Sequence, residues 1–354
     1  MKGRFCSKAN QYTRASMLHW EIMQLRLVIG LVVLLSMGAV VGVAHEVLTP
    51  AAKLDSGPLL VEIPAHDGVL DIASRLYAAG VIRSRVGFVV LAVARGTSRQ
   101  LKAGEYDLAR GASTLDVLSQ IEAGRVKQHL VLHPEGATLT ELARVLETER
   151  LAASGAVTRL ATDRAFLATL GIDGPSLEGY LFPDTYQLVR GMTTEEILTR
   201  MVQRLRAKVG PDLAARAQAR GLTVHQLLTL ASIIEREAVE RDEMRTISAV
   251  FWNRLKINMP LQADPTVQYA TGKERRALTR ADLAMDHPFN TYRRPGLPPG
   301  PIASPGLAAI EAALDPAPVK YLYFVAMDDH RHYFSASLGE HNAAVARYRL
   351  ARAR

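Results

Sequence analysis

Hydrophobic positions are most concentrated near the start of the chain. Residues 27–44 (LVIGLVVLLSMGAVVGVA) form a run of eighteen positions without a charged side chain, close to the minimum length of a membrane-spanning helix. Basic residues precede this run, whereas charges of both signs follow it. The positive-inside rule predicts an uncleaved single-pass helix over 27–45 in the cell (inner) membrane, with segment 1–26 cytoplasmic and the rest extracytoplasmic or periplasmic. A buried core helix and a cleaved signal peptide, with Gly42 and Ala44 at its cleavage site, are the alternatives.

Strand and helix patterns alternate after a short linker at residues 46–58. Helical spacing and turn residues predict the following elements: strands at 59–64 and 104–108, and helices at 67–82, at 85–95 and from Ser113, a plausible N-cap, to Glu122. The order strand, helix, helix, strand predicts a small α+β module over residues 59–127.

The start of this predicted module has a weaker repeat later in the chain. Residues 130–146 (LVLHPEGATLTELARVL) follow the pattern of residues 60–76 (LVEIPAHDGVLDIASRL), with a strand, a turn and an amphipathic helix. The similarity predicts two related modules. Chance resemblance between two ordinary strand-turn-helix units is the alternative.

Two amphipathic helices are predicted within residues 223–257, joined near Asp242, a candidate N-cap. In the first helix, Glu235 and Glu237 fall to either side of the apolar stripe, and Arg236 points away from it. The two glutamates therefore border the buried face. They are either cleft residues or ordinary charged residues at the edge of a core.

Proline and glycine interrupt two later stretches, 258–272 (NMPLQADPTVQYATG) and 287–306 (HPFNTYRRPGLPPGPIASPG). So much proline excludes a helix or a central strand in the second stretch. Rigid loops with polar and aromatic side chains are typical of the walls of a binding cleft, and a surface linker is the alternative. Ser304 and Pro305 are expected to be the N-cap and first residue of a helix over 305–314.

The end of the chain predicts a strand hairpin, 320–327 with 332–337, and a closing helix from about Glu340. Residues 128–354 are therefore expected to form a larger mixed α/β domain. The predicted fold class is α+β, in which an N-terminal transmembrane helix precedes a small α+β module and this larger domain.

Composition narrows the functions open to the chain. Of 354 residues, 48% are hydrophobic and 22% are charged, which supports globular domains. The net charge is +8, but much of the basic excess lies at the two ends, so we expect no nucleic-acid partner. The single cysteine, Cys6, precedes the apolar run, which excludes an intramolecular disulfide and an extracytoplasmic thiolate nucleophile.

Several common catalytic motifs do not occur in the sequence. It contains no glycine-rich phosphate loop, GxSxG elbow or HExxH motif. His330 and His332 are more typical of a solvated hairpin tip than of metal ligands, so we expect no metal and no cofactor. Carboxylate chemistry remains, and the predicted position outside the membrane suggests a polysaccharide substrate.

Glu178 is the main candidate for that chemistry. It lies in SLEGYLFPDTYQL (176–188), just before three apolar residues and a turn predicted at Pro183 and Asp184. Apolar neighbours disfavour the ionised carboxylate and raise its pKa, which would leave a proton for donation near neutral pH. A solvated glutamate at a loop edge is the alternative.

Six segments of the sequence stand out in order: SLEGYLFPDTYQL, LASIIEREA, VFWNRL, MPLQADPTVQYA, NTY followed by GLPPGPIASPG, and YLYFVA with HYFSASLGEHN. They resemble, in the same order, the motifs of the endolytic murein transglycosylase family of bacterial cell-membrane proteins. The resemblance covers roughly residues 59–350. It implies a LysM-like module at 59–127 and a YceG-like catalytic domain at 128–354, whose key residue is the glutamate of the Leu-Glu-Gly motif, Glu178.

The resemblance also implies an activity. A lytic transglycosylase is a carbon–oxygen lyase that cleaves the β-1,4 bond from N-acetylmuramic acid to N-acetylglucosamine and leaves a 1,6-anhydro end. The expected substrate is the nascent peptidoglycan glycan strand, whose elongation is thereby terminated, and peptidoglycan synthases are expected partners. One carboxyl group can perform both proton transfers, whereas ordinary glycosidases need two carboxylates.

Seven polar residues of the later motifs are candidate substrate-binding residues: Glu235, Glu237, Gln262, Asp264, Thr266, Asn290 and Tyr292. Two other functions stay open at this point. One is a peptidoglycan hydrolase in which Glu178 works with a second carboxylate from Glu235, Glu237 or Asp264. The other is a membrane-anchored scaffold that binds glycan without cleaving it.

Overall fold

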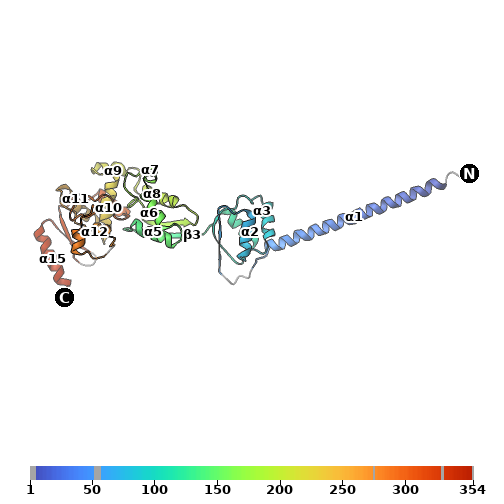
Figure 1. Cartoon of the computed structure of the whole chain (residues 1–354), viewed down its shortest axis with the longest axis horizontal. Coiled ribbons are helices and arrows are strands. Elements are labelled where there is room, and N and C mark those ends of the chain that lie inside the picture. Colours follow the sequence, from blue (N-terminus) through green and yellow to red (C-terminus); the bar gives the residue numbers. More distant parts are fainter. Residues whose placement is uncertain (1–4, 52–56, 274–275, 328–330, 353–354) are drawn as a thin grey trace. The chain divides into compact units, whose positions relative to one another are not determined.

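The computed structural model describes residues 5–51, 57–273, 276–327 and 331–352. The chain divides into two compact units, Met1–Lys127 and Gln128–Arg354, whose elements are labelled in Figure 1. Across the described residues, the strands form three separate two-stranded antiparallel sheets, and most other elements are helices. The protein is therefore a mixed helix-and-strand protein, as predicted.

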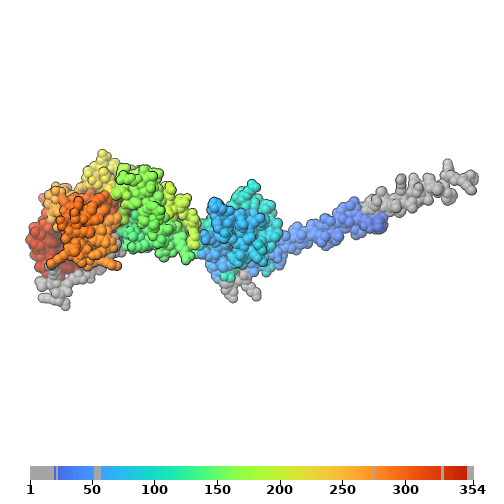
Figure 2. Space-filling view, viewed as in Figure 1, coloured from blue at the N-terminus to red at the C-terminus, as the bar shows by residue number. Residues whose placement is uncertain are grey.

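The first unit opens with a long helix, α1 (Phe5–Leu48). Its part from Met23 to Leu48 is long and apolar enough to cross a membrane, and no other helix in the described ranges is. Figure 2 shows most of this part as a rod, and its side chains from Leu25 to Val41 are exposed. Because its apolar window is not buried, α1 is not the core helix of a soluble domain. A membrane anchor or a signal peptide remains.

A small module follows α1 in the first unit. Its elements are β1 (Leu59–Ile63), α2 (Val69–Ala78), α3 (Arg85–Ala94), β2 (Gly104–Leu108) and α4 (Thr114–Ala123). The two strands pair antiparallel, with Val61 opposite Tyr106. One core contains Ile63, Leu76 and Phe88. The predicted order of elements is confirmed, and the hydroxyl of Ser113 caps α4 as expected.

The end of α1 is packed against this module. The helix contacts α3 and α4, and Val47 in its last turn is buried. Just beyond the helix, the Arg83 guanidinium donates a hydrogen bond to the Pro50 carbonyl at 2.9 Å. The chain leaving the apolar helix is therefore held to the module at least as far as Pro50.

The second unit begins with a similar order of strands and helices, with three helices between its paired strands where the first module has two. Its elements are β3 (Gln128–His133), α5 (Leu139–Thr148), α6 (Ser154–Leu160), α7 (Arg164–Thr169), β4 (Asp184–Val189) and α8 (Thr194–Val209). β3 pairs antiparallel with β4, as β1 does with β2. The connectors 64–68 and 134–138 are equally long, and each leads into a helix of ten residues. The internal similarity seen in the sequence therefore extends to the fold.

The remaining elements of the second unit pack around a central helix, α10. They are α9 (Leu213–Ala219), α10 (Val224–Glu237), the 3₁₀ turn η1 (Arg241–Glu243), α11 (Met244–Lys256), α12 (Asp264–Thr271), α13 (Arg280–Ala284), α14 (Leu307–Leu314), β5 (Tyr323–Ala326), β6 (His332–Ser335) and α15 (Leu338–Arg352). Every residue from Leu227 to Ile234 is buried, and α10 contacts α9, α11, α12 and α14. The helix pair within 223–257, the hairpin and the closing helix are confirmed.

The predicted N-cap at Asp242 is wrong. Asp242 lies inside η1, and Glu243 precedes α11 without a side-chain cap. The Asp242 carboxylate instead pairs with Arg331 at 2.9 Å. An ion pair with a residue distant in sequence has taken the place of the local cap.

Two further local predictions are corrected. Ser304 is not the N-cap of α14: it is buried, its hydroxyl lies 2.8 Å from His133 Nε2, and Gly306 is the cap residue. Asp184 does not form a turn with Pro183, because it is the first residue of β4 and bonds to Arg204. In both cases a tertiary partner determines the local structure.

Candidate active site

Glu178 lies in the loop between α7 and β4 and is only 4% exposed. Its carboxylate oxygens accept the backbone N–H of Leu139, at 3.0 and 3.2 Å. The Tyr269 hydroxyl donates a longer hydrogen bond to the same carboxylate, at 3.4 Å. The solvated loop-edge alternative is therefore wrong: Glu178 is buried between the start of α5 and α12.

Two opposing effects act on the charge of this carboxylate. Burial removes water and disfavours the ionised form. Leu139 is the first residue of α5, where backbone N–H groups lack intrahelical partners and the helix dipole favours a negative charge. The helix terminus opposes the effect of the apolar neighbours, and the predicted upward shift of the Glu178 pKa stays a prediction.

A segment that we call the proline strap, residues 297–306, holds the loop around Glu178. Its Ser304 exchanges backbone hydrogen bonds with the β3–α5 connector, at 2.9 Å from the Gly136 N–H and 2.8 Å to the Ala137 carbonyl. Gly179, which follows Glu178, has φ +79°, and a Cβ there would collide with the Pro301 ring. Glycine is therefore required for the strap to approach this closely.

The same strap is bonded to α10. The Ile302 N–H donates to Ser232 Oγ at 3.0 Å, and the Gly306 N–H donates to Glu235 Oε2 at 2.9 Å. Glu235 thus accepts a hydrogen bond at the N-cap of α14. The proline-rich stretch is not a surface linker, and its prediction as a wall of the site fits these contacts.

An acidic cavity of about 380 Å³ opens beside this region. It is lined by Glu135, Gly136, Glu235, Arg236, Glu237, Asp264, Pro265 and Gln268. Glu235 and Glu237 are both half-buried, which confirms that they border the buried face of α10. Arg236 does not point away as predicted, because it is half-buried and donates to the Gly136 carbonyl at 3.3 Å.

The two glutamates of α10 have raised pKa values. Burial raises the pKa of Glu237 to about 8, with the Asp264 charge adding to the rise while Arg254 and Arg236 oppose it. Burial also raises the pKa of Glu235, and the hydrogen bond from Gly306 opposes that rise. Burial therefore favours the protonated form of both glutamates.

Asp264 lines this cavity and is bonded to Tyr292. The Tyr292 hydroxyl donates to Asp264 Oδ1 at 2.5 Å, and burial together with this contact raises the pKa of Tyr292. Asp264 is exposed at the start of α12. The structure thus brings together four predicted substrate-binding residues: Glu235, Glu237, Asp264 and Tyr292.

The other three predicted substrate-binding residues have different surroundings. Thr266 is buried, with its hydroxyl 2.9 Å from that of Thr291. Asn290 is buried, and its amide donates to the Leu283 and Met285 carbonyls at 3.0 and 2.7 Å. Thr266 and Asn290 therefore hold loops together. The Gln262 side chain is exposed, and its role in binding stays a prediction.

Sequence reasoning missed several groups at the site. Tyr269 and Gln268 both lie in the quoted MPLQADPTVQYA motif, which was the signal that could have identified them. Leu139 contributes a backbone N–H, for which a side-chain pattern gives no signal. Within the described ranges, no three His, Cys, Asp or Glu side chains are arranged to hold a metal ion.

A buried glutamate at a helix N-terminus defines a candidate enzyme of the acid–base class. The glutamate bonds to Tyr269, whose neighbour Gln268 lines a cavity rich in carboxyl groups. The helix-and-strand framework around it has known relatives. The chain belongs to the YceG-like family, whose profile matches residues 61–347. The resemblance to the endolytic murein transglycosylases that the motifs indicated is confirmed.

Named relatives support this assignment. The chain is 35% identical over 319 residues to the endolytic murein transglycosylase of Bacillus subtilis strain 168, covering 86% of this chain and 88% of the relative. It is 30% identical over 350 residues to that of Streptococcus pneumoniae serotype 2, covering 89% of this chain and 63% of the relative. A 2.6 Å crystal structure of a YceG-like protein from Listeria monocytogenes superimposes with TM-score 0.57 at 35% identity, covering 81% of this chain and 98% of that chain.

Proposed function

We propose that this protein is an endolytic lytic transglycosylase of peptidoglycan, with Glu178 as its single catalytic acid and base. The proposal depends on one observation: Glu178 is buried and its carboxylate accepts the backbone N–H of Leu139. The relatives named as murein transglycosylases supply the substrate class. The substrate-binding role of the acidic cavity is part of the same proposal.

The reaction needs one carboxyl group in two protonation states. Protonated Glu178 donates its proton to the glycosidic oxygen while the bond from the muramyl C1 to that oxygen breaks. The resulting carboxylate takes the proton of the muramyl C6 hydroxyl. The oxygen of that hydroxyl bonds to C1 at the same time, which closes the 1,6-anhydro ring. The Leu139 N–H stabilises the carboxylate between these steps. Glu178 ends protonated and no water is consumed.

A two-carboxylate hydrolase is the second candidate. Glu235, Glu237 and Asp264 line one cavity, and the pKa of Glu237 is raised to about 8. A hydrolase would activate a water molecule there. It would release a reducing end, whereas the intramolecular C6 hydroxyl gives an anhydro end.

The first unit has a proposed role in location and affinity. We infer that α1 anchors the chain in the inner membrane, with the N-terminus cytoplasmic and both later domains outside, because basic residues precede the apolar part. Residues 59–127 are proposed as a LysM-like module and residues 128–354 as the catalytic domain. Peptidoglycan synthases are proposed partners. A glycan-binding scaffold would also use this module, but it would not cleave the strands and would release no products.

The products distinguish these functions. Purified glycan strands are digested by the full-length protein in detergent, in ¹⁸O water, and the new ends are weighed by mass spectrometry. The proposal predicts anhydro ends without heavy oxygen. Heavy oxygen at the new muramyl ends would mean hydrolysis, and intact strands would mean a scaffold.

A further inference from the structure

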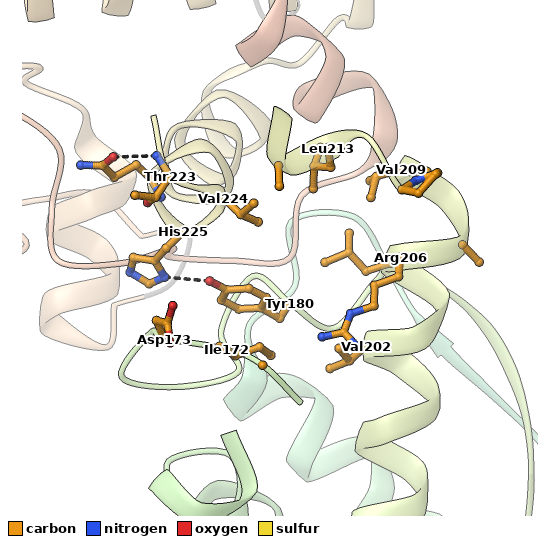
Figure 3. Close-up of a pocket in the computed structure, with 17 residues that line it drawn as sticks. Ile172, Asp173, Tyr180, Val202, Arg206, Val209, Leu213, Thr223, Val224 and His225 are labelled. Atoms are coloured by element: carbon orange, nitrogen blue, oxygen red, sulfur yellow. Dashed lines mark hydrogen bonds between the residues drawn. The ribbon is translucent and has the colours of Figure 1, made fainter. Parts of the chain in front are cut away.

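A second cavity is lined in part by Tyr180 of the Glu178 motif. It has a volume of about 1000 Å³ and is lined largely by aliphatic side chains of α8, α9 and α10 (Figure 3). Its polar contributors include Tyr180 and His225, whose side chains point toward one another in Figure 3. Tyr180 is two residues from Glu178, which connects this cavity to the proposed chemistry.

His225 makes two hydrogen bonds with separate parts of the chain. Its Nε2 lies 2.8 Å from the Pro299 carbonyl, and its Nδ1 lies 3.0 Å from the Tyr180 hydroxyl. A carbonyl oxygen only accepts, so Nε2 carries a hydrogen and donates it to Pro299, while Nδ1 and the Tyr180 hydroxyl share the second hydrogen bond. Burial raises the pKa of Tyr180 to about 12, so its hydroxyl keeps its proton at neutral pH. The imidazole therefore joins α10, the Glu178 loop and the proline strap.

The space around the ring is fitted to it. A Cβ added to Gly174 would lie 2.7 Å from Nδ1 of His225, and one added to Gly300 would lie 3.2 Å from Nε2. The Tyr180 ring stacks on the imidazole with the planes 19° apart. Two glycines and an aromatic ring therefore hold the imidazole in one orientation.

The orientation of the imidazole affects the position of Glu178 through the proline strap. Pro299, bonded to His225, and Pro301, packed against Gly179, belong to the same rigid segment. The Glu178–Tyr180 turn is thus held at Tyr180 by the imidazole and at Gly179 by the strap that the imidazole binds.

We propose that His225 is a positioning residue for Glu178, which fixes the turn carrying the carboxylate through the Tyr180 hydroxyl and the Pro299 carbonyl. The inference rests on the proposed function and extends it to a residue outside the acidic cavity. Acid catalysis depends steeply on geometry, and a displacement of about 1 Å can cost roughly 100-fold in rate. Loss of His225 should therefore slow the chemical step and leave glycan binding nearly unchanged.

The test uses the full-length protein on glycan strands, with rates normalised to folded protein. We expect His225→Ala to lower kcat roughly 10- to 100-fold with KM nearly unchanged. Tyr180→Phe, which keeps the ring, should lower kcat as well. The double variant should be no slower than His225→Ala alone, because both changes remove the same connection. Added imidazole should restore part of the activity of His225→Ala. His129→Ala, near the start of β3, is the matched histidine control and should keep wild-type kcat.

The outcomes separate the two proposals. Wild-type protein that forms no anhydro ends would overturn the proposed function. Wild-type product with unchanged kcat in both variants, or kcat losses that multiply in the double variant, would overturn the positioning role alone. If His225→Ala fails to fold, Tyr180→Phe decides: an unchanged kcat overturns the role, and a lowered kcat at unchanged KM supports it.

Discussion

The Glu178 carboxylate is buried against a helix N-terminus, and this combination suits a group that must be both acid and base. Burial favours the neutral form that donates a proton, and the Leu139 N–H favours the ionised form that accepts one. Neither form is stabilised without opposition. A carboxyl group in this environment can return to its starting state in each cycle.

Replacing Glu178 by glutamine tests this role directly. Glutamine keeps the shape and can still accept the Leu139 N–H, but it carries no titrating proton. We expect kcat to fall about 10²- to 10⁴-fold with little change in the thermal midpoint. Product formation by mass spectrometry and thermal unfolding provide the two measurements.

Glu235→Gln is the matched control, because Glu235 also accepts a backbone N–H, that of Gly306. It should cost much less activity than Glu178→Gln. Equal losses in the two variants would support the two-carboxylate hydrolase. Wild-type turnover in folded Glu178→Gln would eliminate the single-carboxylate mechanism.

Glu237 makes the stability of the protein depend on pH. The pKa of Glu237 is about 8 in the folded protein against an ordinary value of 4.5, so between these values the folded state holds a proton that the unfolded chain has released. The free energy of unfolding therefore falls as pH rises through this window, by at most ~1.4 kcal/mol per pH unit from this group. Glu237→Gln should lack this loss, so its stability relative to wild type should increase from about pH 5 to about pH 8.

Urea unfolding across that pH range checks the effect. Glu195→Gln, at an exposed position of α8, is the control and should follow the wild-type profile. A constant difference between Glu237→Gln and wild type at every pH would show that Glu237 does not hold its proton in the folded state.

At the level of elements, the local sequence pattern predicted a helix or strand correctly where the element's own side chains determine its structure. β1, α3 and β2 were predicted from helical spacing and turn residues, and Ser113 from N-cap preference. The caps at Asp242 and Ser304 failed because Arg331 and His133 bind those side chains from elsewhere in the sequence. A local rule cannot include a partner that only the fold brings near.

The same distinction applies to the candidate site. The motif around Glu178 and the residues of α10 and α12 were predicted from residue type, helical spacing and the family resemblance together. The Leu139 N–H could not, because every residue but proline has this donor. The position of α5 that aims it at Glu178 follows from the pairing of β3 with β4. The part of the site that depends on backbone geometry therefore needed the structure.

At the scale of the whole molecule, the end of α1 determines where the chain can be cut. A variant lacking residues 1–45 keeps Val47 and Pro50, which contact the module, whereas one lacking residues 1–51 loses both. We expect both to be soluble after ultracentrifugation. The shorter variant should be less stable by ~1–3 kcal/mol in urea unfolding, because a buried valine is lost.

Val47→Ala and Leu48→Ala, made in the variant lacking residues 1–45, provide matched controls, since Val47 is buried and Leu48 is exposed. Only Val47→Ala should reduce stability. Recovery of the variant lacking residues 1–45 in the membrane fraction would contradict α1 as the anchor.

The packed end of α1 also affects how such a protein would meet its substrate. The contacts at Val47 and Pro50 leave little slack between the apolar helix and the module that follows. With α1 in the bilayer as proposed, the module would diffuse laterally in a thin layer above the lipid and not through the full volume outside. Confinement of this kind raises the effective concentration of neighbours held in the same layer. Glycan strands still attached at the membrane would be encountered far more often than mature strands further away.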